Sequence, residues 1–434
     1  MKKIFLAFVL ASTFAQAQKV DKYIKEENIA RVIKTLTTDD MMGRSALKTE
    51  HIDKAAAFIE SEFKKIGLQP LKGLTGFRQE FLKEKVSPLT ANVTIDGEII
   101  PLENILVVSE KKEVELKSNA VIKTISVDPS ATNKDQYFMR QAFTLTRDTT
   151  SMLILIAPEF ESAFNQFKEY FTERFVRGNA STKIFVLGKT NATTFTAKAT
   201  QKIETIKMAN ITGMIEGKTK PDEFVVFGGH YDHIGIQKNK IDNDSIANGA
   251  DDDASGTTAV IELARYFKKV KNNNRTIIFV AFTAEEIGGF GSQYFSQQLN
   301  PDKVVAMFNI EMIGKPSKWG QNSAFITGYE RSDFGEILQK NLKGTPFEFK
   351  PDPYPEQNLF YRSDNATLAR LGVPAHTIST DQIDIDKLYH TVNDEVETLD
   401  LKNITSAIKA IALSSKTIID GTDTPKRIDK NTVH

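Results

Sequence analysis

The stretch Phe224-Val-Val-Phe-Gly-Gly-His230-Tyr-Asp232 decides the fold class of this chain. Its apolar residues run without polar alternation, which is typical of a strand buried on both faces of a helix-covered parallel sheet. The run ends at His230 and Asp232, and apolar residues at helical spacing follow over 257–270. We therefore expect an α/β fold in which these two polar residues lie at the exit of a central strand.

The same alternation of strand and helix continues along the chain. Apolar runs predict strands at 224–227, 276–282, 304–309 and 375–378, and helical spacing predicts helices at 257–270, 291–298, 333–342, 366–371 and 404–419. This rhythm indicates a mostly parallel, mixed sheet with helices on both faces. In such sheets the ligand site lies beyond the carboxyl ends of the strands.

Acidic residues and histidines gather at these predicted carboxyl ends. They are Asp252 within Gly249-Ala-Asp-Asp-Asp-Ala-Ser-Gly256, the pair Glu285-Glu286 after the second strand, Glu311 after the third, and His390 after the last. Each alone has a simpler interpretation, as a surface turn, a helix-start acid or a packed loop histidine. Three adjacent aspartates repel one another unless a cation or a helix N-terminus neutralises them. The convergence of all these groups on one edge favours a site for two divalent metal ions.

The residue types suit metal-assisted hydrolysis. The chain has no cysteine, so histidines and carboxylates must hold any metal. Neighbouring acids at a strand end point in different directions, so one of Glu285 and Glu286 can bind metal while the other takes a proton from water. Asp232 can accept the second N–H of the His230 imidazole and fix its tautomer. The adjacent His233 is expected to be polar lining.

These motifs resemble those of the co-catalytic zinc aminopeptidase family, which also contains glutamate carboxypeptidase and, more distantly, the glutaminyl cyclases. The likeness covers about 206–421 and a lead-in segment at 39–70 that includes Met42-Gly-Arg44. It implies two Zn²⁺ ions per chain. Their ligands would be His230, Asp252 and Glu311 for one ion, and Asp252, Glu286 and His390 for the other.

The resemblance implies a metallopeptidase, most directly an aminopeptidase that hydrolyses N-terminal residues of peptides. Glu285 would be the general base that generates a metal-bridging hydroxide, and Asp232 would orient His230. Two departures stand out. The family commonly has Asp where this chain has Glu311, and Asn365 replaces the histidine of a family Ser-Asp-His segment near the substrate.

Four alternatives stay open or are disfavoured at this stage. A carboxypeptidase or dipeptidase would differ only in the charges of the substrate pocket. A glutaminyl cyclase keeps one zinc, against which the complete ligand set argues, and a non-catalytic binding protein would be expected to have lost ligands or the base. A calcium loop is disfavoured because Asp242, Asp244 and Ile246 do not meet the EF-hand spacing.

The overall charge and the N-terminal residues limit which partners and which cellular location we expect. Lys plus Arg (56) equals Asp plus Glu (56), so no net field favours nucleic acid or an anionic membrane, and peptides are the expected partners. Lys2-Lys3, the apolar stretch 4–15 and Ala15-Gln-Ala17 read as a signal peptide over 1–17. That stretch is shorter than the ~20 residues that span a bilayer. We expect a periplasmic or secreted protein with no membrane span.

The remaining segments predict further domains. Helices are expected at 20–36 and 50–66 within an N-terminal lead-in at 18–84. Short alternating runs at 91–95, 120–125, 152–156 and 183–187, with one helix at 160–175, predict a β-rich insert over 85–203. The insert resembles a protease-associated domain by position only. A metallopeptidase domain at 204–421 and a C-terminal tail at 422–434 complete the predicted organisation.

Overall fold

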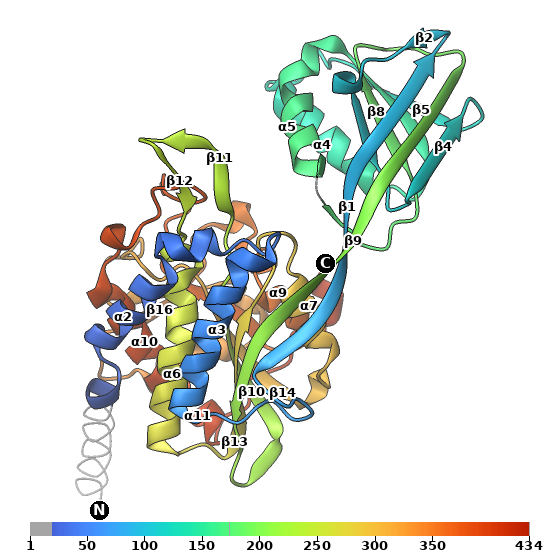
Figure 1. Ribbon diagram of the computed structural model, residues 1–434. Coiled ribbons are helices and arrows are strands. Elements are labelled where there is room, and N and C mark those ends of the chain that lie inside the picture. The colour runs from blue at the N-terminus through green and yellow to red at the C-terminus, as the bar shows by residue number, and fades with distance from the viewer. Residues whose placement is uncertain (1–19, 173, 434) are drawn as a thin grey trace, which may run out of the picture. The chain divides into compact units, whose positions relative to one another are not determined.

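The computed structural model describes residues 20–172 and 174–433, which fall into two compact units (Figure 1). The main unit is formed by the described residues up to Phe81 and from Met208 onward, and the inserted unit by those within Leu82–Lys207. The expected signal peptide, 1–17, lies outside the described residues. No helix among those residues has the length and apolar character that a membrane crossing requires.

The main unit is built on a mixed sheet. Its strands lie in the order β16 (Glu348–Pro351), β15 (Ser323–Ile326), β17 (Ala375–Ser379), β14 (Val304–Ile310), β10 (Lys220–His230), β13 (Arg275–Phe282) and β9 (Phe195–Ile215). Strand β10 pairs in parallel with β13 and β14, and β14 with β17, whereas β9 and β15 run antiparallel to their neighbours β13 and β17. The predicted α/β fold with a mostly parallel, mixed sheet is confirmed.

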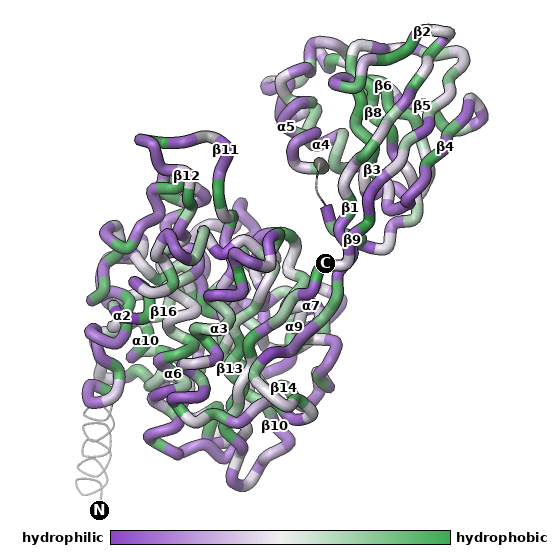
Figure 2. Tube along the Cα trace, viewed as in Figure 1, coloured by the Kyte–Doolittle hydropathy of each residue, from purple (hydrophilic) through white to green (hydrophobic). Residues whose placement is uncertain are grey.

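Helices cover both faces of this sheet. One face carries α2 (Glu26–Leu36), α3 (Thr49–Ile66), α6 (Gly256–Val270), α8 (Phe334–Asn341) and α10 (Leu401–Ser414), and the other carries α7 (Phe290–Gln297) and α9 (Asn365–Ala369). Successive strand residues alternate between the two cores, since Val225 and Phe227 pack in the first and Val226 in the second. Figure 2 shows the apolar residues along β13 that sit between these layers.

Two details of the main unit differ from the predicted elements. The helix expected at 404–419 is broken after Ser414, and α11 (Lys416–Ile419) follows separately. The tail expected at 422–434 includes Ile428, which is buried in the second core. The predicted C-cap Gly67 does end α3 in a left-handed conformation, as glycine allows.

The inserted unit has two layers of strands and one of helices. The four-stranded sheet is β3 (Ile105–Val108), β8 (Lys183–Leu187), β6 (Met152–Ile156) and β5 (Val121–Ile125), and α4 (Lys134–Arg147) and α5 (Glu161–Thr172) pack on one face of it. The other face packs on strands drawn from β1 (Arg78–Ile95), β2 (Glu98–Ile99), β4 (Glu113–Lys117) and β9, and β7 (Arg174–Phe175) pairs with β1. Helix α4, which Asn133 caps, is an addition to the predicted elements.

A β-hairpin interrupts the main unit between two of the predicted site segments. Strands β11 (Gly235–Ile241) and β12 (Asp244–Ala247) pair antiparallel after β10 and before the aspartate-rich turn Ala250–Ser255. Figure 2 shows that the end of this hairpin is mainly hydrophilic. The sequence analysis did not predict it.

Candidate metal centre

The predicted site residues leave the sheet at one edge. Strand β10 ends at His230, β13 ends just before Glu285 and Glu286, and β14 ends just before Glu311. Because β10 is parallel to both neighbours, with His230 paired to Phe282, these exits meet at the same edge. The sheet therefore brings the four side chains together from distant parts of the chain.

Asp252 lies between two of the predicted histidines. Its Oδ1 is 3.2 Å from Nε2 of His230, and its Oδ2 is 3.3 Å from Nε2 of His390. A carboxylate that presents one oxygen to each of two imidazoles is arranged to bridge two metal ions. This geometry supports the choice of the middle aspartate as the bridging residue.

Two sets of donor atoms share Asp252. In one, ligand atoms of His230, Asp252 and Glu311 lie within 4.8 Å of one another. In the other, Oε2 of Glu286 is 3.0 Å from Nε2 of His390, which also faces Asp252. Nε2 of His230 and Oε2 of Glu311 are buried and have no hydrogen-bond partner. Since unpaired buried polar atoms are costly and this donor set suits zinc, the residues fit a pair of zinc ions.

The two flanking aspartates hold loops together. Asp253 accepts the backbone N–H of His230 through Oδ2 (3.1 Å) and that of Met312 through Oδ1 (3.1 Å). Asp251 accepts the backbone N–H of Gly314 through Oδ1 (2.7 Å). Asp253 therefore joins the aspartate-rich turn to the exits of β10 and β14, and Asp251 joins it to the exit of β14.

Two buried groups without an assigned role in the sequence analysis support the same turn. Arg44 is fully buried and donates to the carbonyl oxygens of Tyr231 (2.7 Å) and Gly249 (2.9 Å). Asp394 accepts the backbone N–H of Asp252 (3.0 Å). The sequence offered one signal for each residue. Arg44 lies within the lead-in segment, and Asp394 lies four residues after a predicted ligand.

His233 contacts the site directly. Its Nδ1 lies 2.7 Å from Oε1 of Glu286 and 3.7 Å from Oδ2 of Asp252, and its ring is buried. It therefore does more than line the site. A hydrogen bond from His233 to Oε1 leaves Oε2 of Glu286 to face His390, which fixes the orientation of that carboxylate.

Asp232 meets His230 through its backbone. Nδ1 of His230 is 3.1 Å from the carbonyl oxygen of Asp232 and 3.8 Å from its Oδ1. The Asp232 carboxylate instead accepts the backbone N–H of Glu285 (3.1 Å). The carbonyl thus performs the tautomer-fixing role expected of the carboxylate, and the carboxylate holds the turn that presents Glu285.

Burial dominates the electrostatics of the metal-free site. Burial and the neighbouring Glu311 raise the pKa of Glu285 well above its ordinary value. Burial and Asp252 raise the pKa of Glu311 to about 7. Burial also opposes ionisation of Asp252, but His230 and the other two histidines hold the pKa of this carboxyl well below its usual range. The site therefore crowds buried carboxyl groups together, and bound cations would favour their ionised forms.

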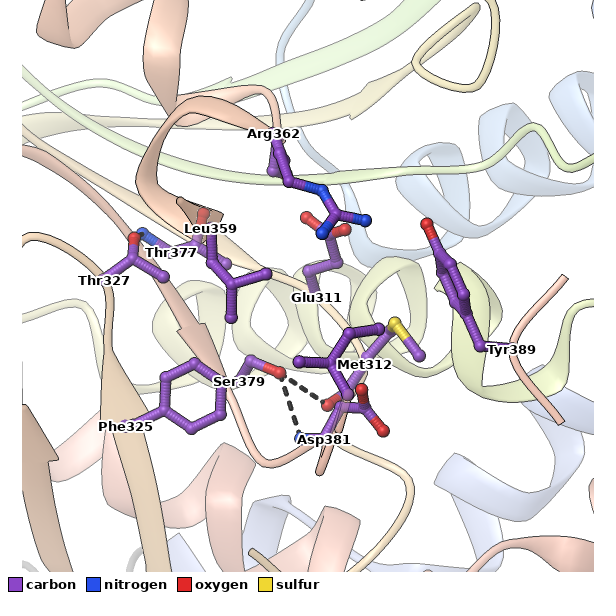
Figure 3. Close-up of a pocket in the computed structure, with 12 residues that line it drawn as sticks. Glu311, Met312, Phe325, Thr327, Leu359, Arg362, Thr377, Ser379, Asp381 and Tyr389 are labelled. Atoms are coloured by element: carbon purple, nitrogen blue, oxygen red, sulfur yellow. Dashed lines mark hydrogen bonds between the residues drawn. The ribbon is translucent and has the colours of Figure 1, made fainter. Parts of the chain in front are cut away.

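A pocket opens beside Glu311 (Figure 3). It encloses about 460 Å³ of empty space, part of it open to solvent. Its lining residues are Glu311, Met312, Phe325, Thr327, Leu359, Arg362, Ser363, Thr377, Ser379, Asp381, Ile383 and Tyr389. The ring of Tyr389 stacks on that of His390 with centroids 3.9 Å apart, so the pocket wall adjoins the candidate metal ligands.

Asn365, at the position where the resemblance led us to expect a histidine, is held by hydrogen bonds on both sides of its amide. Its Nδ2 donates to the carbonyl oxygen of Phe360 (3.0 Å), and its Oδ1 accepts from the hydroxyl of Thr377 (2.9 Å). Thr377 lines the pocket, so Asn365 acts on the site by holding one of its walls.

Part of the chain is similar in sequence to known peptidases. Residues 210–414 match the profile of Peptidase family M28. A probable zinc metalloprotease of Pyrenophora tritici-repentis is 39% identical over 111 residues, 25% of each protein. Leucine aminopeptidase 1 of Penicillium rubens is 31% identical over 206 residues, 44% of this chain and 51% of the relative. The chain thus spans about a quarter to about half the length of these relatives.

Solved structures share the fold over nearly the whole chain. An aminopeptidase from Aneurinibacillus sp. strain AM-1 matches with a TM-score of 0.57 at 17% identity, covering 96% of this chain and 98% of that one. BSAP, a zinc aminopeptidase from Bacillus subtilis, matches with a TM-score of 0.54 at 16% identity, covering 92% and 97%. At such identities the likeness establishes the fold.

Proposed function

We propose that this protein is an exported, zinc-dependent aminopeptidase that removes N-terminal residues from peptides. The observation that carries the proposal is the Asp252 carboxylate, which faces His230 and His390 with one oxygen each. The match of 210–414 to Peptidase family M28 and the zinc named for the relatives support the choice of reaction and metal. The signal-like residues 1–17 support export.

Glu285 is the proposed general base. Bound zinc ions would supply the positive charge that lowers the pKa of water and polarises a peptide carbonyl. Glu285 is adjacent in sequence to the proposed ligand Glu286. Its backbone N–H donates to the Asp232 carboxylate, and this hydrogen bond holds the turn in place. Burial raises the pKa of Glu285, so its carboxyl can take a proton from water and hold it until the leaving amine accepts it.

Tyr389 and the adjoining pocket would hold the substrate. Burial and the nearby Asp252 raise the pKa of Tyr389, so its hydroxyl stays protonated and can donate a hydrogen bond to a carbonyl oxygen that gains charge. The pocket walls include the apolar side chains of Met312, Phe325, Leu359 and Ile383. We therefore propose that this pocket accepts a large, uncharged N-terminal side chain.

The charge beside the pocket favours a free amino group. Glu285, Glu311 and Asp364 are buried acids, and burial together with neighbouring carboxylates raises the pKa of each, so carboxyl groups crowd this side of the site. Carboxylates in excess of the bound metal charge attract an ammonium group and disfavour a second carboxylate. An N-terminal amine is the part of a peptide that fits this requirement.

Arg362 favours a second candidate, a carboxypeptidase. Its guanidinium lines the same pocket beside Glu311, where it could pair with a substrate carboxylate (Figure 3). Substituting Arg362→Ala separates the two functions. An aminopeptidase should lose at most a few-fold in kcat/KM, whereas a carboxypeptidase should lose about 10²-fold or more because a charged hydrogen-bond partner is removed.

The test combines metal analysis with a substrate panel. Purified mature protein should contain two zinc atoms per chain and hydrolyse aminoacyl chromogenic substrates, but not N-acetylated versions of them. Glu285→Gln should keep both zinc atoms and lose about 10²-fold or more in rate, while the exposed Glu397→Gln should match the wild type. Full activity of Glu285→Gln, or turnover only of peptides with a free C-terminus, would contradict the proposal.

A further inference from the structure

His390 is the most exposed of the five predicted ligands. Its side chain is 38% exposed, whereas those of His230, Asp252 and Glu286 are at most 6% exposed and Glu311 is intermediate. It lies in a loop outside the sheet, and its backbone is left-handed with φ of 56°. Because a non-glycine residue resists that conformation, contacts on both sides of His390 must hold it in place.

One such contact lies four residues after His390. Asp394 accepts the backbone N–H groups of Asp251 and Asp252 (both 3.0 Å), and its carbonyl oxygen accepts the N–H of Ala250 (3.0 Å). This side of the loop is therefore fastened directly to the turn that carries the bridging aspartate.

The other contact lies four residues before His390 and runs through a lysine. Nζ of Lys315 is 2.7 Å from Oδ2 of Asp386 and 3.3 Å from Oδ2 of Asp251. The other oxygen of Asp386 accepts the N–H of Leu388 (2.8 Å), which begins the turn into Tyr389 and His390. Asp251 and Asp386 are almost fully buried, so this contact is shielded from water.

The ammonium group of Lys315 lies within a local cluster of acidic side chains. Carboxylate oxygens of Asp251, Asp381 and Asp386 lie within 4.8 Å of one another, an arrangement that could by itself hold a cation. Lys315 already lies against two of these acids. Burial and Asp251 raise the pKa of Asp381, which agrees with this acid sharing a proton with Asp386. The cluster therefore serves as a link between two loops.

We propose that Lys315 is a positioning residue that ties the loop carrying His390 to the loop carrying Asp252, and so sets zinc affinity at the Asp252–Glu286–His390 end of the centre. This inference rests on the proposed two-zinc site. Lys315 touches no predicted ligand side chain in the contacts described, and acts through Asp386 and Asp251. Residues that orient metal ligands without binding the metal themselves typically contribute 10- to 100-fold to metal affinity.

The test measures zinc binding to the metal-free full-length mature protein by competition with a chelator. His390→Ala first identifies which of the two binding events belongs to this end. Lys315→Met should then raise the dissociation constant of that event by about 10- to 100-fold and leave the other within about three-fold. Lys315→Arg, which keeps the charge, should recover part of the loss. Lys409→Met, which removes an ion pair of equal length to Asp21, should change neither event.

Each outcome decides the inference. Unchanged affinity in Lys315→Met would overturn it, as would equal weakening of both events with a lower melting temperature, because that result indicates a general structural role. If Lys315→Met does not fold, Asp386→Asn provides the same measurement with the same expected result. Wild-type protein that binds no zinc would instead contradict the proposed function, so the two failures are distinguishable.

Discussion

The main unit and the inserted unit share an architecture but differ at their strand exits. In both, parallel strands are covered by helices, as for β5, β6 and β8 of the inserted unit. Strand β6 is followed by Ala157 and β8 by Gly188, whereas β10 ends at His230 and β14 is followed by Glu311. Every group of potential metal ligands found in the described part of the chain lies in the main unit.

A parallel sheet therefore provides an edge at which a site can form, but it does not determine which residues lie there. Placing acids and histidines at the exits costs stability, because burial and neighbouring carboxylates raise the pKa of these acids when no cation is bound. In the inserted unit the aromatic side chains instead pack between the helices and one face of the sheet.

The largest expected effect comes from removing the bridging charge. Asp252→Asn should lower kcat/KM by at least about 10³-fold, since several kcal/mol of barrier reduction would depend on the proposed metal pair. Zinc content should fall with it. Asp128→Asn, which alters an acid shortly after β5 in the inserted unit, should stay within about two-fold of wild type. Equal losses in both variants would erase the contrast between the units.

A core substitution in the inserted unit should separate stability from metal binding. Phe167 is fully buried among the rings of Phe138, Phe143, Phe171 and Phe185. Phe167→Ala should cost about 3–5 kcal/mol in the free energy of unfolding of this unit. Urea unfolding measures that change, and zinc content should remain at the wild-type value. Loss of zinc from the variant under native conditions would show that the site depends on the inserted unit.

A smaller effect is expected from the hydroxyl of Tyr389. Tyr389→Phe keeps the ring that stacks on His390 and removes one hydrogen-bond donor from the pocket. We expect kcat to fall by about 10²-fold, the scale for a donor to developing negative charge, with unchanged zinc content. Tyr361→Phe, whose hydroxyl contacts Arg331, serves as the matched control. A change in KM alone would point to ground-state binding.

The smallest effect concerns a buried acid that has cationic side chains as neighbours. Glu62 in α3 contacts Arg31 (2.6 Å), Lys65 (3.1 Å) and Arg265 (2.9 Å). Burial opposes its ionisation, but hydrogen bonds from Arg31 and the other two cations lower its pKa to about 2. The resulting stability is complete above the unfolded pKa of about 4.3 and is lost as pH falls towards about 2.

Glu62→Gln tests the direction of this pH dependence of stability in metal-free protein. The variant should be less stable than wild type by about 2–3 kcal/mol at pH 7, from urea midpoints, and the difference should shrink at about pH 3.5. A difference that grows on acidification would contradict the assignment. The comparison with Glu285, whose pKa shifts in the opposite direction, isolates the effect of nearby cations on a buried acid.

Strongly periodic elements of the fold were predictable from the sequence. Helix α6 was expected at 257–270 and is found at Gly256–Val270, and α3 differs from its predicted range by one residue. Helix α4 and the β11–β12 hairpin were missed because few of their residues are apolar and buried. Only Phe138 and Ala142 of α4 are buried, so its amphipathic pattern is weak.

The candidate site was predictable where a strand exit carried the residue, and less so where a contact crosses the chain. His230, Glu286 and Glu311 follow apolar runs, which gave them a local signal. Arg44 and Lys315 lie far from the residues that they hold, so no local pattern marks them. The contact of Asp232 with Glu285 depends on a turn through Ala284, whose φ is 59°.

The β11–β12 hairpin affects how relatives of this chain can be recognised from sequence. It fills the chain between His230 and the aspartate-rich turn, and its base is fixed, since a Cβ on Gly43 would lie 2.5 Å from the carbonyl oxygen of Ala247. The number of residues beyond that base does not influence where the two ligands meet. A search that demands a constant interval between the first two motifs would discard chains whose chemistry is intact, whereas one that scores only the two anchored ends would retain them.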